Sequence, residues 1–295
     1  MKQTRSGFVA VICRPNVGKS SLVNTLVGDK VAIVSDKPQT TRNRIMGVVN
    51  GEGYQLVLLD TPGIQKPKNK LGRYMEGSVK DSLKDVEATV VVIDGSTGLG
   101  AKDEEAIARG LQSDARLWIA VNKTDVAEPA DIQALVETLK VCEGIYRVCP
   151  ISARTGQGLE ILLGGLIDCL PEGPAYFPPD IISDQPESFL CAEIIREKAL
   201  LLLREEVPHG IGVDLEKFME REDGVVEVHA VIYCERDSHK GIIIGKNGGM
   251  LKRIGTLARE EMEIFFDAKV FIKLHVKTRE GWRNSPLALR ELGYE

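Results

Sequence analysis

Hydrophobic positions in residues 8–170 fall into short apolar runs separated by amphipathic stretches. The apolar runs predict strands at Phe8–Ile12, Ile45–Val49, Tyr54–Asp60, Ala88–Asp94, Arg116–Asn122 and Arg147–Ile151. The amphipathic stretches predict helices at Lys19–Val27, Lys70–Lys84, Asp103–Leu111, Asp131–Val141 and Leu159–Leu170. Strands rich in Val, Ile and Leu between helices are typical of parallel sheets covered on both faces. We therefore expect an α/β domain with a mostly parallel sheet, in which Asn50-Gly51 makes one hairpin.

The pattern changes after residue 170. Five prolines between Pro171 and Pro186 predict a linker rather than a packed element. Beyond it the expected elements are a helix at Phe189–Val207, strands at Ile211–Phe218 and Val225–Cys234, a helical segment with a glycine-rich turn at His239–Phe265, and a strand at Lys269–Val276. We predict a first domain at 1–170, a linker at 171–188, a second, α+β domain at 189–280 and a tail at 281–295.

A phosphate-binding loop is indicated where the first strand meets the first helix. Loop amides and a helix N-terminus together favour an anion, with the lysine on β- and γ-phosphates and the serine on Mg²⁺. Cys13 stands where the pattern G-x-x-x-x-G-K-[ST] has glycine, so a turn that merely contains Gly-Lys-Ser is the alternative. The residues expected around the phosphates are Cys13, Arg14, Pro15, Asn16, Val17, Gly18, Lys19 and Ser20.

Two further segments are candidates for the metal and the γ-phosphate. The third strand ends in Asp60-Thr61-Pro62-Gly63, whose carboxylate is placed to hold Mg²⁺ and whose Gly63 N–H can meet a γ-phosphate. In the polar segment before the second strand, a threonine could close over Mg²⁺ and γ-phosphate when GTP is bound. Thr41 is our choice and Thr40 its rival. The predicted metal set is Ser20, Thr41 and Asp60, and the predicted catalytic set is Lys19, Thr41 and Gly63.

Guanine selectivity is predicted at the ends of the next strands. Asn122-Lys123-Thr124-Asp125 follows an apolar strand, and a carboxylate at Asp125 can accept hydrogen bonds from guanine N1–H and N2–H₂ but not from adenine. Asn122 is expected at the outer edge of the base and the Lys123 stem over its face. Ser152-Ala153-Arg154 would place backbone N–H groups near guanine O6.

A candidate RNA site lies in the second domain. Gly245-Lys246-Asn247-Gly248 is a G-x-x-G loop, and residues 240–279 carry nine Lys and Arg against four Asp and Glu in a chain of net charge −5. Such a loop lets a nucleic-acid backbone approach closely, and the charge favours single-stranded RNA. The residues expected to bind RNA are Ile243, Ile244, Gly245, Lys246, Asn247, Gly248 and Lys252. Ile254 is expected in the same groove, whereas Trp282 is expected to pack rather than stack on a base.

The cysteine spacing and the lengths of the apolar runs indicate where in the cell the protein functions. Six cysteines without C-x-x-C spacing fit reduced thiols, and no apolar run reaches the length of a membrane span, so a cytoplasmic protein is expected. Peripheral contact with a membrane stays open.

The motif set PNVGKS, QTTR, DTPG, NKTD and SAR resembles the Era family, bacterial Ras-like GTPases with a C-terminal type II KH domain. The resemblance covers essentially the whole chain and implies hydrolysis of GTP with Mg²⁺. It also implies binding of the 3′ region of small-subunit ribosomal RNA and a role in assembling the small ribosomal subunit. We expect a monomer.

Three positions, Ile64, Asn16 and Cys13, affect what the resemblance implies about hydrolysis. Ile64 follows DTPG where many GTPases have a water-orienting glutamine, and this resembles the hydrophobic-substituted members. In potassium-dependent relatives the loop asparagine, here Asn16, ligates K⁺. The alternative, to which we give equal weight, is that Asn16 only favours the turn of the loop. Cys13 leaves open a KH protein that binds GTP but barely hydrolyses it. Asp125 argues against a third interpretation, an ATP-dependent P-loop enzyme.

Overall fold

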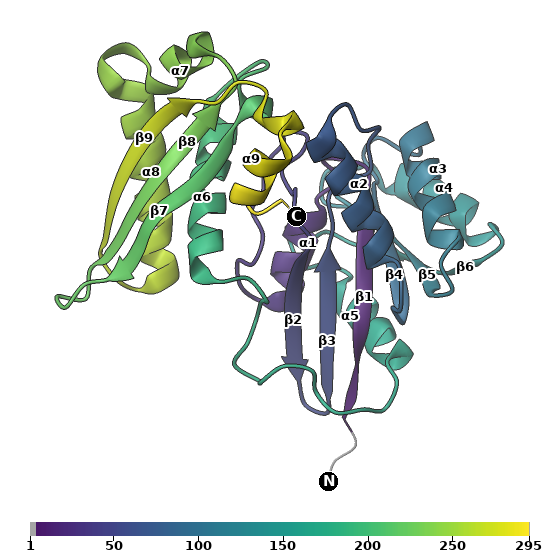
Figure 1. Ribbon diagram of the computed structural model, residues 1–295. Coiled ribbons are helices and arrows are strands. Elements are labelled where there is room, and N and C mark those ends of the chain that lie inside the picture. Colours follow the sequence, from purple (N-terminus) through teal and green to yellow (C-terminus); the bar gives the residue numbers. More distant parts are fainter. Residues whose placement is uncertain (1–3, 295) are drawn as a thin grey trace. The chain divides into compact units, whose positions relative to one another are not determined.

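The computed structural model describes residues 4–294, which divide into two units (Figure 1). The first takes the residues up to Val34, then Thr41–Lys66 and Met75–Asp184, and the second takes Ser35–Thr40, Pro67–Tyr74 and the residues from Gln185 on. The division near Asp184 falls inside the expected linker. Among the described residues, no helix is both long and apolar enough to cross a bilayer.

The first unit is built on a six-stranded sheet in the order β2-β3-β1-β4-β5-β6. Its strands are β1 (Arg5–Cys13), β2 (Ile45–Gly51), β3 (Tyr54–Asp60), β4 (Ala88–Asp94), β5 (Arg116–Asn122) and β6 (Ile145–Pro150). β2 pairs antiparallel with β3 across the Asn50-Gly51 hairpin, and the other neighbours are parallel. The mostly parallel sheet expected from the hydrophobic runs is therefore confirmed.

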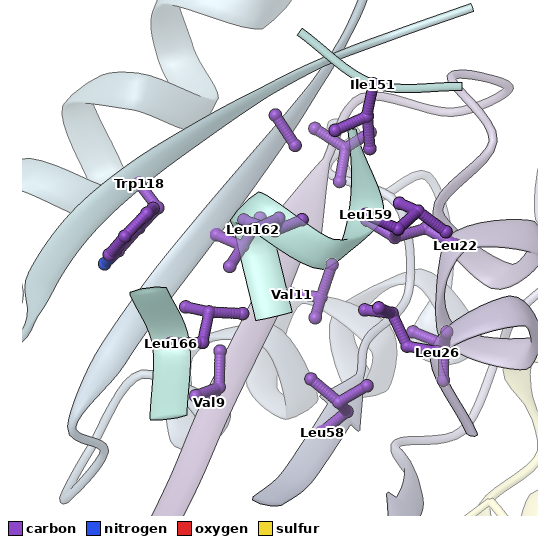
Figure 2. Close-up of a cluster of buried hydrophobic side chains, with 14 of the residues drawn as sticks. Val9, Val11, Leu22, Leu26, Leu58, Trp118, Ile151, Leu159, Leu162 and Leu166 are labelled. Atoms are coloured by element: carbon purple, nitrogen blue, oxygen red, sulfur yellow. The ribbon is translucent and has the colours of Figure 1, made fainter. Parts of the chain in front are cut away.

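Helices cover both faces of this sheet because its strands are apolar on both sides. The helices are α1 (Lys19–Val27), α2 (Lys70–Ser82), α3 (Ala101–Leu111), α4 (Pro129–Lys140) and α5 (Leu159–Cys169). On one face, α1 and α5 bury Leu22, Leu162 and Leu166 against Val9 and Val11 (Figure 2). On the other face, side chains of α3 and α4 pack with those of β4 and β5. The layers bring the carboxyl ends of β1, β3, β4 and β5 to one edge, where ligands of such sheets bind.

The proline-rich segment after α5 is ordered by hydrogen bonds to the first unit, although none of its residues 171–186 is buried. The expected linker therefore has partners but is not part of the core. Ser6 N–H donates to Pro171 O at 3.0 Å, and Val48 N–H donates to Ile182 O at 2.8 Å. Gln55, only 2 % exposed, accepts hydrogen bonds from Tyr176 and Phe177 N–H at 2.7 and 2.9 Å and donates to Phe177 O. Prolines remove N–H donors, and this one buried amide satisfies three of the peptide groups of the segment.

The second unit holds a three-stranded sheet in the order β7-β8-β9, with β7 antiparallel and β9 parallel to β8. Its elements are α6 (Glu187–Leu202), β7 (Gly212–Glu220), β8 (Val226–Cys234), α7 (Asp237–Ile244), α8 (Gly249–Phe266), β9 (Val270–Thr278) and α9 (Pro286–Glu291). This α-β-β-α-α-β order confirms the expected α+β fold. Helix α6 ends before the expected Val207, because Leu203 is extended and Glu205 has a φ of 55°.

Candidate functional site

The loop between β1 and α1 requires glycine at one position. Gly18 has a φ of +93°, and a Cβ built there would lie 2.4 Å from Asn122 Nδ2. A side chain at this position would therefore be strained and would collide with the end of β5. The loop closes against the carboxyl ends of the neighbouring strands, as a phosphate-binding loop does.

Cys13 is accommodated without distorting this loop. It is the last residue of β1, does not adopt a positive φ, and its side chain is 2 % exposed within the apolar cluster beneath α1 and α5. Burial raises the pKa of the thiol to about 12, so the group is neutral at physiological pH. Cys13 O accepts the Ile64 N–H at 2.8 Å. The glycine of the phosphate-loop pattern is thus not needed for backbone conformation in this chain.

Four buried polar side chains meet at the start of α1. Ser20 Oγ lies 2.9 Å from Thr41 Oγ1 and 3.1 Å from Asp60 Oδ2, and the Lys19 ammonium pairs with the Asp60 carboxylate. Thr40, the rival, instead donates its hydroxyl to Lys37 O at 2.6 Å. The structure therefore brings Thr41 to Ser20 and Asp60, and hydroxyl and carboxylate oxygens are the ligands Mg²⁺ prefers. This donor set fits a magnesium ion with bound phosphates.

The Asp60-Thr61-Pro62-Gly63 segment lies directly against the phosphate loop. Thr61 donates its hydroxyl to Val11 O at 2.8 Å. A Cβ on Gly63 would lie 3.2 Å from Pro15 Cα, so the two loops touch at the backbone. Ile64 is 2 % exposed and packs in the core, where its side chain cannot orient a water molecule.

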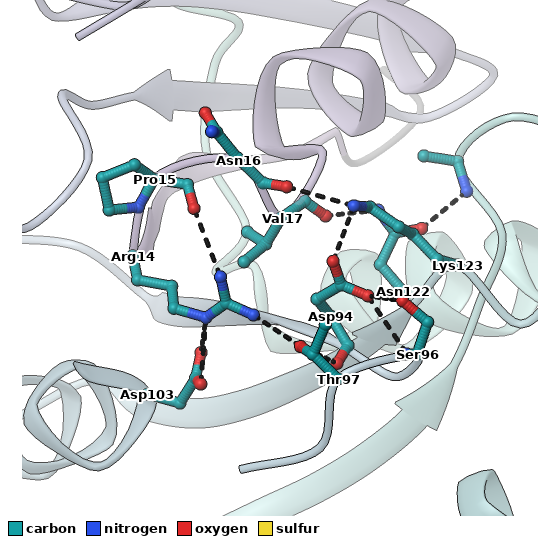
Figure 3. A network of polar contacts seen from close by, with 11 residues as sticks. Arg14, Pro15, Asn16, Val17, Asp94, Ser96, Thr97, Asp103, Asn122 and Lys123 are labelled. Carbon is teal, nitrogen blue, oxygen red and sulfur yellow. Dashed lines mark hydrogen bonds and ion pairs between the residues drawn. The ribbon is translucent and has the colours of Figure 1, made fainter. Parts of the chain in front are cut away.

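Asn122 joins three loops through its side-chain amide. Its Nδ2 donates to Val17 O at 2.8 Å, and its Oδ1 accepts the Ala153 N–H at 2.9 Å (Figure 3). Both amide groups are engaged inside the protein, so a contact of Asn122 with a base edge stays a prediction. The placement explains why Asn122 is nearly buried: it fixes the β5 end to the phosphate loop.

Lys123 and Asp94 form a second link that the sequence did not single out. The Lys123 ammonium donates to Asp94 Oδ2 at 2.6 Å and to Asn16 O at 3.1 Å (Figure 3). Burial by itself would raise the pKa of Asp94, but the hydrogen bonds from Lys123 and Ser96 outweigh it and hold that pKa below its usual range. Asp94 is the last residue of β4 and lies at the same end of the sheet as the other site residues. Its position at a strand end was the sequence signal that could have identified it as a site residue.

Arg14 is anchored in the same network. Its Nε donates to both carboxylate oxygens of Asp103 at 2.9 and 3.0 Å, and a terminal nitrogen donates to Thr97 Oγ1 at 2.7 Å (Figure 3). Asp103 also accepts the Gly100 N–H at the start of α3. The side chain of Arg14 is therefore directed to α3, and the contribution of Arg14 to a phosphate site would come from its backbone.

Asp125 lies in a small cavity of 180 Å³ between the ends of β5 and β6. Ser152 Oγ donates to it at 2.6 Å, and Arg154 pairs with it. The Ser152 hydrogen bond, with the charge of Arg154, holds the pKa of Asp125 below its usual range, so the carboxylate is ionised at neutral pH. Gly18, Lys123 and Ala153 line the cavity, together with Ser21 and Val126, which the sequence analysis did not assign. Thr124 N–H donates to Ile151 O at 3.2 Å, and Thr124 is not among the residues that line the cavity.

The G-x-x-G loop of the second unit joins α7 to α8. Gly245 and Gly248 have φ values of 72° and 75°, and a Cβ on Gly245 would lie 2.7 Å from Met250 Cβ. Lys246 and Asn247 are exposed at the loop tip. Glycine is thus required at Gly245 both by backbone conformation and by packing.

A groove of 450 Å³ runs from this loop between α8 and β9. Lys252 and Arg259 from α8 line it, and Ile272 and Leu274 from β9 supply apolar surface. Ile243 and Ile254 are fully buried in the core, so the expectation that their side chains face RNA is wrong. Ile244 is half-buried against the same core. Leu251, Gly255 and Arg259 are spaced four residues apart and so lie on one face of α8. This spacing was the sequence signal that could have identified the face of α8 that lines the groove.

The tail of the second unit packs, as expected. Trp282 is fully buried, and its indole Nε1 donates to Gly210 O at 2.9 Å. A buried indole with its N–H satisfied contributes to the core and is not available to stack on a base.

Comparison with known proteins accords with both sites. Residues 8–123 match the family model described as 50S ribosome-binding GTPase, and residues 206–283 match the KH domain. GTPase Era of Ruminiclostridium cellulolyticum is 47 % identical over 291 residues, covering 99 % of this chain and 98 % of the relative. GTPase Era of Caldanaerobacter subterraneus subsp. tengcongensis is also 47 % identical over 291 residues, covering 98 % of each.

Two solved structures are similar over 99 % of both chains, each with 37 % identity and a TM-score of 0.94. One is Era in complex with MgGDPNP and nucleotides 1506–1542 of 16S ribosomal RNA. The other is a variant of Aquifex aeolicus Era bound to GDP and AlF₄⁻. With relatives of this identity over nearly its full length, the chain belongs to the GTPase Era family.

Proposed function

We propose that this GTPase is a switch that binds single-stranded RNA from the 3′ region of small-subunit ribosomal RNA and acts in assembly of the small ribosomal subunit. The observation that carries the proposal is the groove beside the G-x-x-G loop, in the same chain as a guanine-nucleotide site. A relative of 37 % identity was crystallised with 16S ribosomal RNA nucleotides, which supports that target.

In the nucleotide site, Ser20, Thr41 and Asp60 would hold Mg²⁺, which supplies charge neutralisation of the phosphates when bound. Lys19 would contact the β- and γ-phosphates, and the backbone from Cys13 to Gly18 would surround them. On hydrolysis, Thr41 and Gly63 would lose their γ-phosphate contacts and release their loops.

Water would be positioned without a glutamine, because Ile64 is buried. The backbone groups of Thr41 and Gly63 are the candidates for that task. K⁺ held by Asn16 would assist: this side chain is exposed, and its residue has a φ of 69°. The same φ fits the alternative role of Asn16 as a turn former.

Guanine would be selected in the cavity beside Asp125. Its ionised carboxylate would accept from the N1–H and N2–H₂ edge, and the backbone of Ser152 and Ala153 would lie near O6. Lys123 would cover the base face, with Thr124 beside it. Asp60, Thr61, Pro62 and Ile64 complete the proposed nucleotide contacts.

The RNA assignment is tested by fluorescence anisotropy with a labelled single strand from the 3′ end of small-subunit ribosomal RNA. The full chain is titrated with GDP or with a non-hydrolysable GTP analogue. Asp at both Lys246 and Asn247 places two negative charges at the loop tip, so we expect binding to fall at least tenfold. Lys102→Asp, at an exposed position on α3, is the control for introducing negative charge away from the loop. Equal binding by the loop variant and the wild type would contradict the assignment.

The remaining assignments are proposals of the same kind. The domain limits 1–170, 189–280 and 281–295, with the linker at 171–188, follow from the sequence pattern, and a cytoplasmic location follows from the cysteine spacing and the length of the apolar runs. A monomeric state and peripheral contact with the inner face of the membrane are further proposals. The competing function is a KH protein that binds GTP and barely hydrolyses it. It was based on Cys13 altering the phosphate loop, but the Cys13 side chain packs into the core.

A further inference from the structure

Among the described residues, α6 and α8 cover one face of the second unit's sheet. On the other face the C-terminal tail packs at the start of β7, where a Cβ on Gly212 would lie 2.9 Å from Leu292, and the opposite end, at Phe271, is open. Figure 1 shows α6 and α8 behind β7, β8 and β9. Along β9, Val270, Ile272, Leu274 and Val276 pack toward the helices. The alternate residues Phe271, Lys273, His275 and Lys277 therefore face the open side.

Phe271 is the aromatic centre of this open face. Its side chain is 44 % exposed, which is high for a phenylalanine in a strand. The Arg221 guanidinium carbon lies 5.0 Å from the centroid of its ring, and the His229 ring meets its edge at 6.1 Å between centroids. A phenyl ring with a guanidinium over it offers stacking surface to any base.

Glu227 organises the cations around that ring. It is paired with Phe271 in the β8–β9 register, and it accepts hydrogen bonds from Arg221 Nε at 2.6 Å and Lys217 at 2.8 Å. His229 Nε2 lies 2.8 Å from Oε1, the carboxylate oxygen that Lys217 also contacts. Arg221 donates to Glu227 through Nε, so this hydrogen bond does not involve the terminal nitrogens of the guanidinium. One carboxylate thus fixes two cations, Lys217 and Arg221, although the hairpin adds Glu222 and Asp223 nearby in sequence.

Lys273 supplies a charge without a partner. It is exposed, lies opposite His229 in the register, and makes no ion pair within residues 4–294. Lys277, two positions further along the same face from His275, is instead neutralised by Glu216 at 2.8 Å. The free cation therefore lies at the Phe271 end of the strand.

This end is continuous with the RNA groove. Phe271 lines the groove together with Gly248 of the G-x-x-G loop and Arg259 of α8, and β9 is the edge strand of the sheet. A strand of RNA that leaves the groove across this edge meets the ring, then Lys273. KH grooves hold about four nucleotides, so a longer single strand must leave at one end.

We propose that the open sheet face is a second RNA subsite, in which the nucleotide next to those in the groove stacks on Phe271 and Arg221 and its phosphate pairs with Lys273. The inference rests on the proposed binding of single-stranded RNA. A duplex would not fit the same role, because its bases are stacked internally and cannot reach the ring.

The test compares a short RNA that fills only the groove with the same RNA extended on its 5′ or its 3′ side. We expect one extension to tighten binding to the wild type, and Phe271→Ala to abolish that gain, about fivefold or more from the energy of one stacked base. Phe271→Tyr should retain it, which separates stacking from folding. Lys273→Gln should lower the salt slope for the extended RNA by about 0.7, the value for one phosphate on a single strand.

Controls separate the subsite from the groove. Ile264→Ala, at an apolar side chain 83 % exposed on α8, and Lys102→Gln should leave every affinity unchanged. If neither extension helps the wild type, or if Phe271→Ala and Lys273→Gln bind the extended RNA normally, the subsite is overturned while the groove stands. If the wild type binds no RNA at all, both the subsite and the proposed RNA function fail.

Discussion

Replacing Asp125 by asparagine should exchange the base specificity of the GTPase. The carboxylate is ionised and lies in the cavity formed by the ends of β5 and β6. It can accept two hydrogen bonds from guanine, whereas an asparagine amide would oppose one N–H donor to another. Xanthine has an oxygen in place of the guanine 2-amino group, so the amide donates to it favourably.

The magnitude follows from the bond that is lost. Asparagine keeps one acceptor oxygen for N1–H, but the bond to the 2-amino group is lost; at about 1.5–3 kcal/mol for a hydrogen bond to a charged group, GTP affinity should fall by about 10- to 10²-fold or more. Ser152 Oγ, at 2.6 Å from the carboxylate, can still donate to the asparagine oxygen, so the loop should keep its conformation.

Equilibrium titration with GTP, xanthosine triphosphate and ATP measures the exchange. Asp131→Asn, the same change at an exposed position on α4, is the matched control and should bind like the wild type. Because the pKa of Asp125 lies below its usual range, wild-type selectivity should persist from neutral pH down to about 5. An Asp125→Asn protein that still prefers GTP to xanthosine triphosphate would refute the role of this carboxylate.

Three further predictions test the surroundings of the sites. Cys13→Gly should leave GTP turnover within about twofold and lower the free energy of unfolding by about 1–2 kcal/mol, because it removes a buried side chain that does not shape the loop; a large gain in turnover would contradict this. Gly18→Ala should abolish tight nucleotide binding, measured by titration, because of its φ of +93° and the contact with Asn122. Glu227 has its pKa lowered from 4.5 to about 2, foremost by the hydrogen bond from Arg221, so its ionised form stabilises the fold above about 4.5 and this contribution is lost as pH falls toward 2. The melting temperature of Glu227→Gln should therefore lie below that of the wild type at neutral pH, and the two should converge in acid. A difference that stays constant with pH would contradict the stabilising role of the ionised carboxylate.

Strand positions in the first unit could be predicted because apolar runs end at polar residues with chemical roles. β3, β4 and β5 have the bounds that the sequence indicates, and their last residues, Asp60, Asp94 and Asn122, all lie at the ligand edge. Two of those three ends were recognised as motifs. Asp94 was not, because its role depends on Lys123, a partner 29 positions away that only the fold brings close.

Elements whose stability depends on distant partners were predicted less well. The proline-rich segment carries no pattern of its own, and Gln55, which holds it, is 122 positions away from Phe177. Ile243 and Ile254 were assigned to the groove because both flank the G-x-x-G loop. Which side of a helix faces the core depends on the sheet beneath it, and here Leu251, Ile272 and Leu274 line the groove instead.

The central claim is that one chain couples a guanine-specific hydrolytic site to an RNA groove. The most direct measurement is multiple-turnover release of phosphate from GTP by the purified full chain with Mg²⁺, in KCl and in NaCl, with and without single-stranded RNA, beside an ATP control. We predict slow turnover of GTP, none of ATP, and faster turnover in KCl if Asn16 holds K⁺. Tight GTP binding without turnover under every condition, or equal turnover of ATP, would contradict the account.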